Sequence, residues 1–234
     1  MQAPPRPGPG YPAGCACGAW AAVGARRPGR SARCGVGMLR LIDCDAVAES
    51  NLNRQMVAEF ETIGMRKTLA AERMIRRYNR TIDLDLRDVR AGEENAAALC
   101  EGMDVVIDAV DDLSAKEALA VHCVGQGIAL LSSMGTGNKL GTAFSMQDLA
   151  RTQGDPLARA MRRRLRRRGI EHLPVCISAE LPRGVPPDEA GGHTPASIAF
   201  VPPSAGLTLA AEAVRILLER EADSHAGERN HHRD

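Results

Sequence analysis

Short apolar runs alternate along the chain with longer segments of helical periodicity. The runs 39–43 (LRLID), 104–110 (DVVIDAV) and 128–135 (IALLSSMG) have the length and composition of buried strands. Residues 81–89 (TIDLDLRDV) alternate apolar and polar side chains, as a half-exposed strand does. Strands and helices that alternate at such short intervals predict an α/β fold: a Rossmann-like, mostly parallel sheet with helices on both faces.

Helices are predicted between these strands and after them. Segment 62–79 carries an apolar stripe opposite a face of arginines, and segment 114–127 ends at a glycine. Segment 155–170 has a proline in its first turn and a glycine after its last turn. Less regular patterns predict an edge strand at 173–180 and a last strand at 197–203. The predicted helices are 62–79, 95–102, 114–127, 155–170 and 205–220.

Composition divides the chain into one domain and two flanking segments. Residues 1–33 are rich in proline, glycine and arginine and show no period, which predicts a disordered or loosely packed segment. Residues 34–220 are long enough for one well-packed domain. The polar tail 221–234 is expected to be disordered.

Charge and cysteine content narrow the function classes. The formal net charge of +1 points to no particular partner. Seven cysteines occur without a C-x-x-C pair, so a structural zinc site is not expected, and the scattered spacing indicates a reducing cytoplasm. The apolar runs are too short to cross a bilayer, so membrane insertion is not expected.

Polar side chains gather where the predicted strands end. Asp43 and Asp45 follow the first strand, and Asp108 and Asp111 close a later one. The run 51–55 (NLNRQ) comes shortly after the first pair, and Lys67 opens the next helix region. Ligands of open parallel sheets bind beyond the carboxyl ends of strands. Carboxylates for a ribose or Mg²⁺ thus share one edge with cations for phosphates, which favours a nucleoside triphosphate.

Ordinary structural roles compete with this interpretation. An aspartate after a strand often caps a helix or forms a turn, and NLNRQ would also suit a solvated turn. Lysine is usually a surface residue, although this chain has only Lys67, Lys116 and Lys139. Cys176 is more consistent with a buried thiol than with a nucleophile. The order of the polar features, rather than any single residue, supports a ligand site.

The stretches LIDCDAVAESNLNRQ, GMRKTLAAERM and VVIDAVDD together resemble the ThiF/MoeB/E1 superfamily of adenylating enzymes. The resemblance implies that an aspartate after the first strand binds the ATP ribose, that the NLNRQ residues and a helix lysine contact phosphates, and that a later aspartate supports Mg²⁺. The ATP-binding residues implied in this way are Asp43, Asp45, Asn51, Asn53, Arg54, Gln55, Lys67 and Asp108, and the catalytic residues are Arg54, Lys67 and Asp111, with Asp111 as the Mg²⁺ ligand.

Within the superfamily, the stretches at 132–170 and 197–215 resemble the tRNA threonylcarbamoyladenosine dehydratases. That resemblance implies ATP-dependent cyclisation of threonylcarbamoyladenosine in tRNA through an acyl-adenylate. It also implies a cytoplasmic enzyme, a homodimer and partners in sulfur transfer or cysteine desulfuration. The run RRRLRRR is a candidate for tRNA phosphates, although such runs are usually solvated faces. Its residues are Arg162, Arg163, Arg164, Arg166, Arg167 and Arg168.

Three other functions stay open at this point. The chain would suit an adenylating activator of a ubiquitin-like sulfur carrier, although the absence of C-x-x-C pairs argues against that class. A non-catalytic tRNA-binding relic of the family would lack ATP binding but keep the basic run. A plain NAD-dependent enzyme would use Asp43 for a ribose but would leave NLNRQ and Lys67 without a function.

The family resemblance also implies a strand and a G-x-G-G-x-G loop before residue 39. The run 32–37 (ARCGVG) stands where that unit should end, but residues 18–31 show neither a hydrophobic strand nor a clean glycine loop. The backbone amides of such a loop cradle phosphates, so its loss should weaken ATP binding and remove a central strand. Either residues 1–31 are a frame-shifted N-terminus or the protein has diverged.

Overall fold

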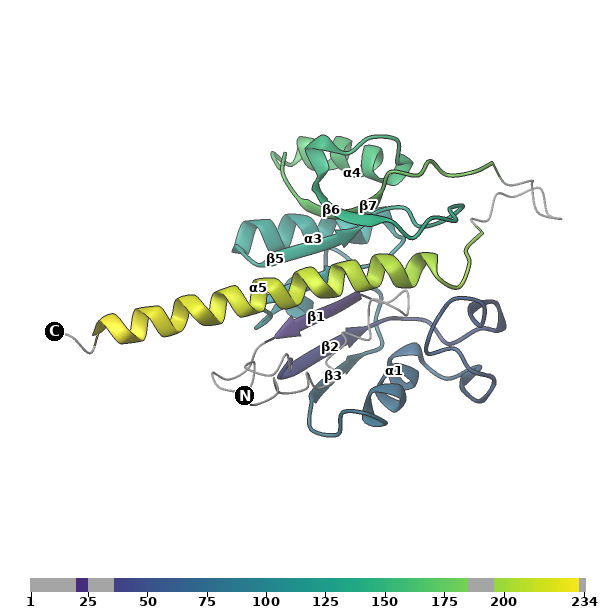
Figure 1. The fold of residues 1–234 in the computed structure, drawn as a ribbon, viewed down its shortest axis with the longest axis horizontal. Coiled ribbons are helices and arrows are strands. Elements are labelled where there is room, and N and C mark those ends of the chain that lie inside the picture. Colours follow the sequence, from purple (N-terminus) through teal and green to yellow (C-terminus); the bar gives the residue numbers. More distant parts are fainter. Residues whose placement is uncertain (1–19, 25–35, 185–195, 232–234) are drawn as a thin grey trace, which may run out of the picture.

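The computed structural model describes residues 20–24, 36–184 and 196–231, and the side chains of 36–184 and 196–220 among them. In this part of the chain seven strands form one sheet in the order β3-β2-β1-β4-β5-β7-β6 (Figure 1). Strand β1 is antiparallel to both β2 and β4, and β6 is antiparallel to β7, so the other five strands point the same way. The strands are β1 Trp20–Gly24, β2 Met38–Ile42, β3 Asp83–Arg87, β4 Val105–Asp108, β5 Ala129–Ser133, β6 Phe144–Asp148 and β7 Pro174–Ser178.

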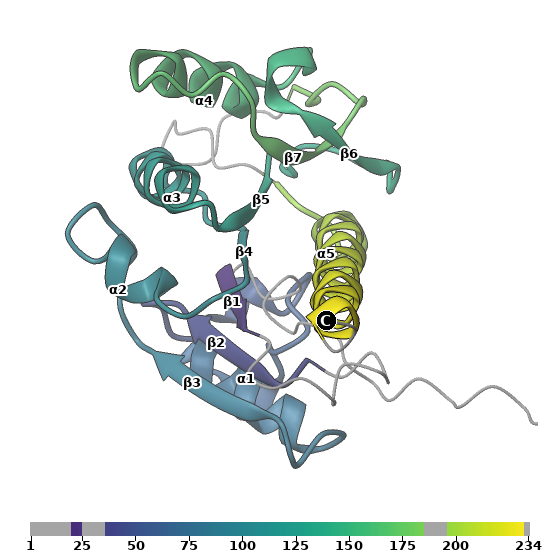
Figure 2. The same cartoon turned by 90° about the vertical axis from the view of Figure 1, so that its left-hand side faces the viewer.

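Helices cover both faces of the sheet, as the sequence predicts. Helices α2 and α3 lie on one side and α5 on the other (Figure 2). Successive side chains of β4 point to opposite faces of the sheet, so this strand contributes to the hydrophobic cores on both faces. Val106 packs with the cluster under α2, α3 and α4, while Val105 and Ile107 pack with the cluster under α1 and α5. The helices are α1 Lys67–Arg76, α2 Ala96–Cys100, α3 Leu113–Gln126, α4 Pro156–Arg167 and α5 Val201–His231, with 3₁₀ turns at Glu49–Asn51, Phe60–Thr62 and Leu149–Arg151.

Local signals in the sequence account for the ends of α3 and α4. The Asp112 side chain accepts hydrogen bonds from the Ser114 and Ala115 amides at 2.7 and 3.1 Å, and α3 ends at Gly127 with a φ of 67°. The Asp155 carboxylate accepts from the Ala158 amide at 2.9 Å and caps α4. These are the aspartate caps and the left-handed glycine that helices of this kind favour.

Two predicted strands after residue 141 need correction. Segment 173–180 contains β7, but β7 lies between β5 and β6 and is not an edge strand. The edge is β6, whose alternating exposure at 144–148 is the pattern of a one-sided strand. Segment 197–203 forms no strand, because Pro202 and Pro203 lack amide hydrogens for a ladder and instead stand in the first turn of α5.

Three other boundaries differ from the expectations. In the predicted helix 62–79, only α1, Lys67–Arg76, is α-helical. Gly64, which has a φ of 82°, lies before the start of this helix. Helix α5 continues to His231, where a disordered tail from residue 221 is expected. The expectation of no strand within residues 18–31 is wrong, because β1, Trp20–Gly24, lies there and takes a central position in the sheet, antiparallel to its neighbours. Residues 25–35, where the glycine loop is expected, lie outside the described residues.

One part of α5, Val201–Arg220, is long and apolar enough to cross a membrane by length and composition alone. In the structure α5 lies along the sheet (Figure 1) and contacts β4, β5, β6 and β7. Ala205, Leu209 and Ala213 are buried in the cluster on that face of the sheet. Packing against the sheet therefore accounts for the apolar face of the helix.

Candidate functional site

The chain leaves the carboxyl end of β2, makes a long excursion and returns to the same place at α1. The Val47 amide donates to the Met65 carbonyl at 2.8 Å, and the Lys67 amide donates to the Asp45 carbonyl at 3.0 Å. This closure brings the Lys67 ammonium to 2.7 Å from Asp45 Oδ2 and 3.7 Å from Asp43 Oδ2. Two strand-end carboxylates and a helix-start lysine, which the sequence places apart, therefore meet at one edge of the sheet.

The two aspartates of this cluster have different environments. Asp43 is 9% exposed, and burial raises the pKa of its carboxyl group even though the Asp45 amide and Lys67 favour the charged form. The hydrogen bond from Lys67 lowers the pKa of Asp45, whose side chain is 58% exposed. Asp43 is therefore a partly desolvated acceptor, and hydrogen-bond donors of a ligand would stabilise its charged form.

A cavity of about 90 Å³ opens beside these residues. Its apolar wall includes Ile42, Val89 and Val110, and its polar wall includes Asp43 and Asp111. Asp111 is exposed, and no hydrogen bond or ion pair of its carboxylate is found within the described residues. The cavity lies at the carboxyl ends of the strands, so a nucleotide would place one part in it and extend along the edge of the sheet with the rest.

The NLNRQ run forms a compact loop before α1. Asn51 is buried, and its side chain accepts from the Ala48 amide at 3.1 Å, so this residue shapes the loop. The Arg54 guanidinium donates through Nη1 to the Ser50 carbonyl and to Asn53 Oδ1, each at 2.8 Å. The Asn53 amide group donates to the Ser197 carbonyl at 3.1 Å, which ties the loop to the start of α5.

Two features of this loop suit a ligand. Arg54 is half-buried, and only its Nη1 nitrogen has a protein partner among the described contacts, so Nε and Nη2 keep donors. Gln55 Oε1 is buried without a hydrogen-bond partner. No described contact joins Arg54 to Lys67, so the structure places the predicted phosphate-binding residues in two neighbouring groups and not in one cluster.

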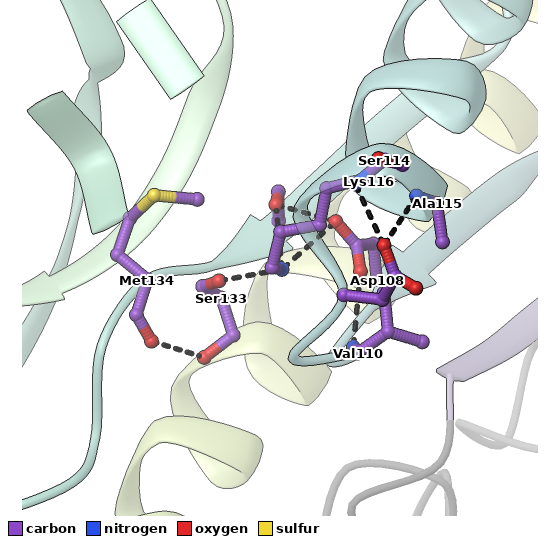
Figure 3. Close-up of polar contacts among 9 residues, drawn as sticks. Asp108, Val110, Ser114, Ala115, Lys116, Ser133 and Met134 are labelled. Carbon is purple, nitrogen blue, oxygen red and sulfur yellow. Dashed lines mark hydrogen bonds and ion pairs between the residues drawn. The ribbon is translucent and has the colours of Figure 1, made fainter. Parts of the chain in front are cut away.

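Asp108 corrects one predicted contact with ATP (Figure 3). It is fully buried; its Oδ2 lies 3.0 Å from Lys116 Nζ and 2.6 Å from Ser132 Oγ, and its Oδ1 accepts from the Val110 amide at 3.1 Å. Lys116 also donates to the Ser133 carbonyl at 2.8 Å. Both carboxylate oxygens are therefore occupied by the protein, and Asp108 holds the ends of β4 and β5 together where a nucleotide contact is expected.

Lys116 is a residue whose role the sequence left unassigned, although the scarcity of lysine was a signal. All three lysines are buried and paired with an aspartate. Lys139 lies 3.2 Å from the Asp155 carboxylate that caps α4. Lysine is rarely buried unless it is paired, so each pair marks a place where the fold or a ligand needs a positive charge.

The described cysteines are Cys44, Cys100, Cys123 and Cys176, and all are free thiols. Burial raises the pKa of Cys176 to about 12, and the side chain is inaccessible to solvent. At neutral pH this thiol stays protonated, and the thiolate is the nucleophilic form. The interpretation of Cys176 as a buried thiol is therefore confirmed.

The arginines of the RRRLRRR run do not form a uniform surface. Arg162 donates through Nε to the Leu149 carbonyl at 3.0 Å. Arg164 and Arg168 form ion pairs with Glu117 of α3 at 3.1 and 2.9 Å. Three of the six predicted tRNA-binding residues therefore hold the fold together. The other three, Arg163, Arg166 and Arg167, are exposed and show no hydrogen bond or ion pair within the described residues.

Comparison with known proteins agrees with this geometry. The model of the ThiF family matches residues 23–233. The chain belongs to the ThiF family. Its relatives include the tRNA threonylcarbamoyladenosine dehydratase of Bacillus subtilis, which is 34% identical over 203 residues that span 80% of each protein. An adenylyltransferase and sulfurtransferase, MOCS3 of Anopheles gambiae, is 32% identical over 90 residues, 38% of this chain and 20% of that protein.

Solved structures place this ThiF-family chain in the same fold. The crystal structure of the Escherichia coli tRNA N6-threonylcarbamoyladenosine dehydratase TcdA in complex with ATP matches with a TM-score of 0.72 and 28% sequence identity. The match covers 82% of this chain and 80% of that one. The predicted fold class and family are thereby confirmed, and the roles of the individual site residues stay predictions.

Proposed function

We propose that this protein cyclises threonylcarbamoyladenosine in tRNA, with loss of water, at the expense of ATP. The observation that carries the proposal is the cluster of Asp43, Asp45 and Lys67, which opens on a cavity that a free Asp111 carboxylate also lines. The relatives that match most of the chain bear the name of this activity. The hydrogen-bond donors and acceptors around this cavity fit a nucleotide.

The adenosine part of ATP suits the slot at the ends of β2, β3 and β4. Ile42, Val89 and Val110 offer the apolar surface that a base requires. Asp43 stands at the end of β2, where an aspartate accepts hydrogen bonds from ribose hydroxyl groups in folds of this type. Because burial raises its pKa, two hydroxyl donors would stabilise the Asp43 carboxylate in the complex.

Positive charge lies beyond the ribose position. Lys67 is the first residue of α1, so its ammonium and the free amides of the helix N-terminus favour an anion at the same place. Arg54 offers two further guanidinium nitrogens from the NLNRQ loop. Asp111 would hold Mg²⁺ through its free carboxylate, and the ion would supply charge neutralisation on the phosphates.

The reaction uses this charge in its first step. The substrate carboxylate attacks the α-phosphate and pyrophosphate leaves, which joins two negative groups that repel each other. Lys67 and Arg54 offset the repulsion and stabilise the charge on the departing pyrophosphate. The carbamoyl nitrogen then attacks the activated acyl carbon, the ring closes, and AMP carries away the carboxylate oxygen. No enzyme nucleophile is needed, which agrees with the buried Cys176.

ATP–pyrophosphate exchange tests this function. Purified protein, Mg²⁺ and tRNA that carries threonylcarbamoyladenosine should exchange labelled pyrophosphate into ATP, and unmodified tRNA should not support the exchange. The Arg54→Ala variant should lose most of the exchange, whereas Arg73→Ala, an exposed arginine elsewhere on α1, should keep it. Absence of exchange with wild-type protein would refute the proposal or implicate the N-terminal segment; replacement of residues 25–35 by an intact glycine loop, which leaves β1 in place, separates the two.

A second function rests on the match to a sulfurtransferase relative. An activator of a ubiquitin-like sulfur carrier would catalyse exchange of pyrophosphate into ATP when a small protein that ends in Gly-Gly is present. Modified tRNA would not support this exchange. The same assay distinguishes the two substrates. We also propose that the protein forms a homodimer, which sedimentation analysis tests, and that it has sulfur-transfer partners.

A further inference from the structure

Half of the residues of helix α4 are arginines, and one face of the helix is buried. Ala158, Met161 and Leu165 pack into the core beside α3. Three arginines are bound within the protein, because Arg162 donates to the Leu149 carbonyl and Arg164 and Arg168 pair with Glu117. This internal use explains only part of the positive charge on the helix.

The remaining arginines of α4 have no such role. They are exposed, and none of their side chains has a hydrogen bond or ion pair within the described residues. Their spacing of four, three and one residues places them along one side of a helix, opposite the buried face. At 1.5 Å per residue the row is about 12 Å long. We call this row the arginine stripe; its members are Arg159, Arg163, Arg166 and Arg167.

The stripe has more positive charge than solubility requires. The whole chain has a formal net charge of only +1, so the charge of the stripe is a local excess and not a general property. Glu117, the acidic residue packed against α4, is already shared by Arg164 and Arg168. Four guanidinium groups with free donors in one row match a chain of phosphates.

The position of α4 connects the stripe to the candidate site. Arg164 donates to Ser114 Oγ at 3.2 Å, and the Ser114 amide is capped by Asp112, the neighbour of Asp111. A cavity of about 610 Å³ lies here, and Arg168, Arg90 and Asp112 line it. Arg90 and Asp112 also line the small cavity beside Asp43. Helix α4 thus packs against the end of α3 that belongs to the same edge of the sheet as the proposed reaction site.

We propose that the arginine stripe is a docking surface for the phosphate backbone of RNA, and that it holds the tRNA of the proposed function beside the site. This inference rests on the proposed function for the identity of the RNA. It adds Arg159 to the basic run and assigns Arg162, Arg164 and Arg168 to the fold.

A pair of triple variants tests the stripe. In the stripe variant, Arg163→Gln, Arg166→Gln and Arg167→Gln remove three charges from α4. In the control, Arg73→Gln, Arg77→Gln and Arg80→Gln remove three exposed charges on and after α1, at the opposite end of the sheet (Figure 1). Binding of modified tRNA is measured without ATP across a series of salt concentrations.

We expect the stripe variant to bind tRNA roughly 30-fold more weakly at moderate salt, with the slope of log K against log salt reduced by about 2. The control variant should bind like wild type. Equal binding by the stripe variant and wild type, or an equal loss in both variants, would overturn the proposal. So would unchanged tRNA binding with lost binding to phosphatidylserine vesicles, because that result assigns the stripe to a lipid surface.

Exchange activity of the wild-type protein separates this inference from the proposed function. Weaker binding by the stripe variant, together with no exchange by the wild-type protein or by the protein with the intact glycine loop, would uphold the docking surface and refute the reaction. Wild-type exchange together with unchanged binding by the stripe variant would refute the docking surface and uphold the reaction.

Discussion

Lys67 and Lys116 begin from similar positions and end in different roles. Each lies in the first turn of a helix that leaves the same edge of the sheet, and each pairs with an aspartate near the end of a strand. Lys116 meets Asp108, Ser132 and the Ser133 carbonyl, so all three of its hydrogens have protein acceptors. Lys67 has one short contact, to an aspartate that is largely exposed, and keeps donors for a ligand.

The difference shows that the protein contacts of a lysine–aspartate pair, and not its residue types, distinguish a structural pair from a ligand-binding pair. A buried ion pair whose hydrogen-bonding groups all have protein partners cannot bind a ligand as well, and removal of one partner leaves an uncompensated charge. A pair open to solvent contributes little to stability and can exchange its partner for a phosphate. Stability should therefore depend on Lys116, and activity on Lys67.

The largest effect is expected for Lys116→Met. This change leaves the Asp108 carboxylate buried without its cation, which should reduce the free energy of unfolding by about 3–5 kcal/mol. Urea denaturation followed by circular dichroism measures the loss. The double variant Lys116→Met, Asp108→Asn should recover part of it, because the unpaired charge is gone. A single variant as stable as wild type would show that the network does not hold the sheet ends together.

Lys67→Ala should affect activity more than stability. We expect the rate of pyrophosphate exchange to fall by about 10²–10³-fold, because a charge that stabilises the transition state is lost. The free energy of unfolding should fall less than in Lys116→Met, because Asp45 is exposed to water and only the more distant Asp43, at 3.7 Å, is a buried partner. Exchange kinetics and urea denaturation of the same preparation give both values. If the variant is strongly destabilised but its folded molecules exchange pyrophosphate at the wild-type rate, Lys67 has a structural role like that of Lys116.

Asp43→Asn probes the desolvated carboxylate. Burial raises the pKa of Asp43 in the folded state above its value in the unfolded chain, so this group costs stability once the pH rises through that window. Near neutral pH the variant should therefore have a melting temperature equal to or above that of wild type, and the difference should disappear near pH 4. Exchange activity should fall because the ribose acceptor is lost. A variant that is less stable at neutral pH and equally active would contradict both expectations.

The smallest effect is expected for Cys176→Ala. Cys176 is buried with a pKa of about 12, so exchange activity should be unchanged. The lost sulfur should reduce the free energy of unfolding by about 1 kcal/mol. Single-turnover measurements check the rate. A large loss of rate without a loss of stability would make the thiol a participant in the reaction.

Much of the fold could be predicted because its signals are local. Apolar runs located β2, β4 and β5, and the aspartate and glycine caps of α3 lie within the helix sequence itself. The family was recognisable from three short stretches, because their polar residues follow the strands in a characteristic order along the chain. Strand β6 was not predicted, and segment 173–180 was expected at the edge instead; pairing depends on which strand lies beside which, and sequence order does not state that.

The sequence by itself therefore determined the fold class, the family and the edge of the sheet where the site lies. Only the tertiary structure decided that Asp108 belongs to the core while Asp111 is exposed and lines the cavity, and which arginines of α4 are bound. Those outcomes depend on contacts between distant segments, such as Arg164 with Glu117, which are 47 residues apart. An aspartate or an arginine has the same chemistry in both roles, and its function follows from the partners that folding brings to it.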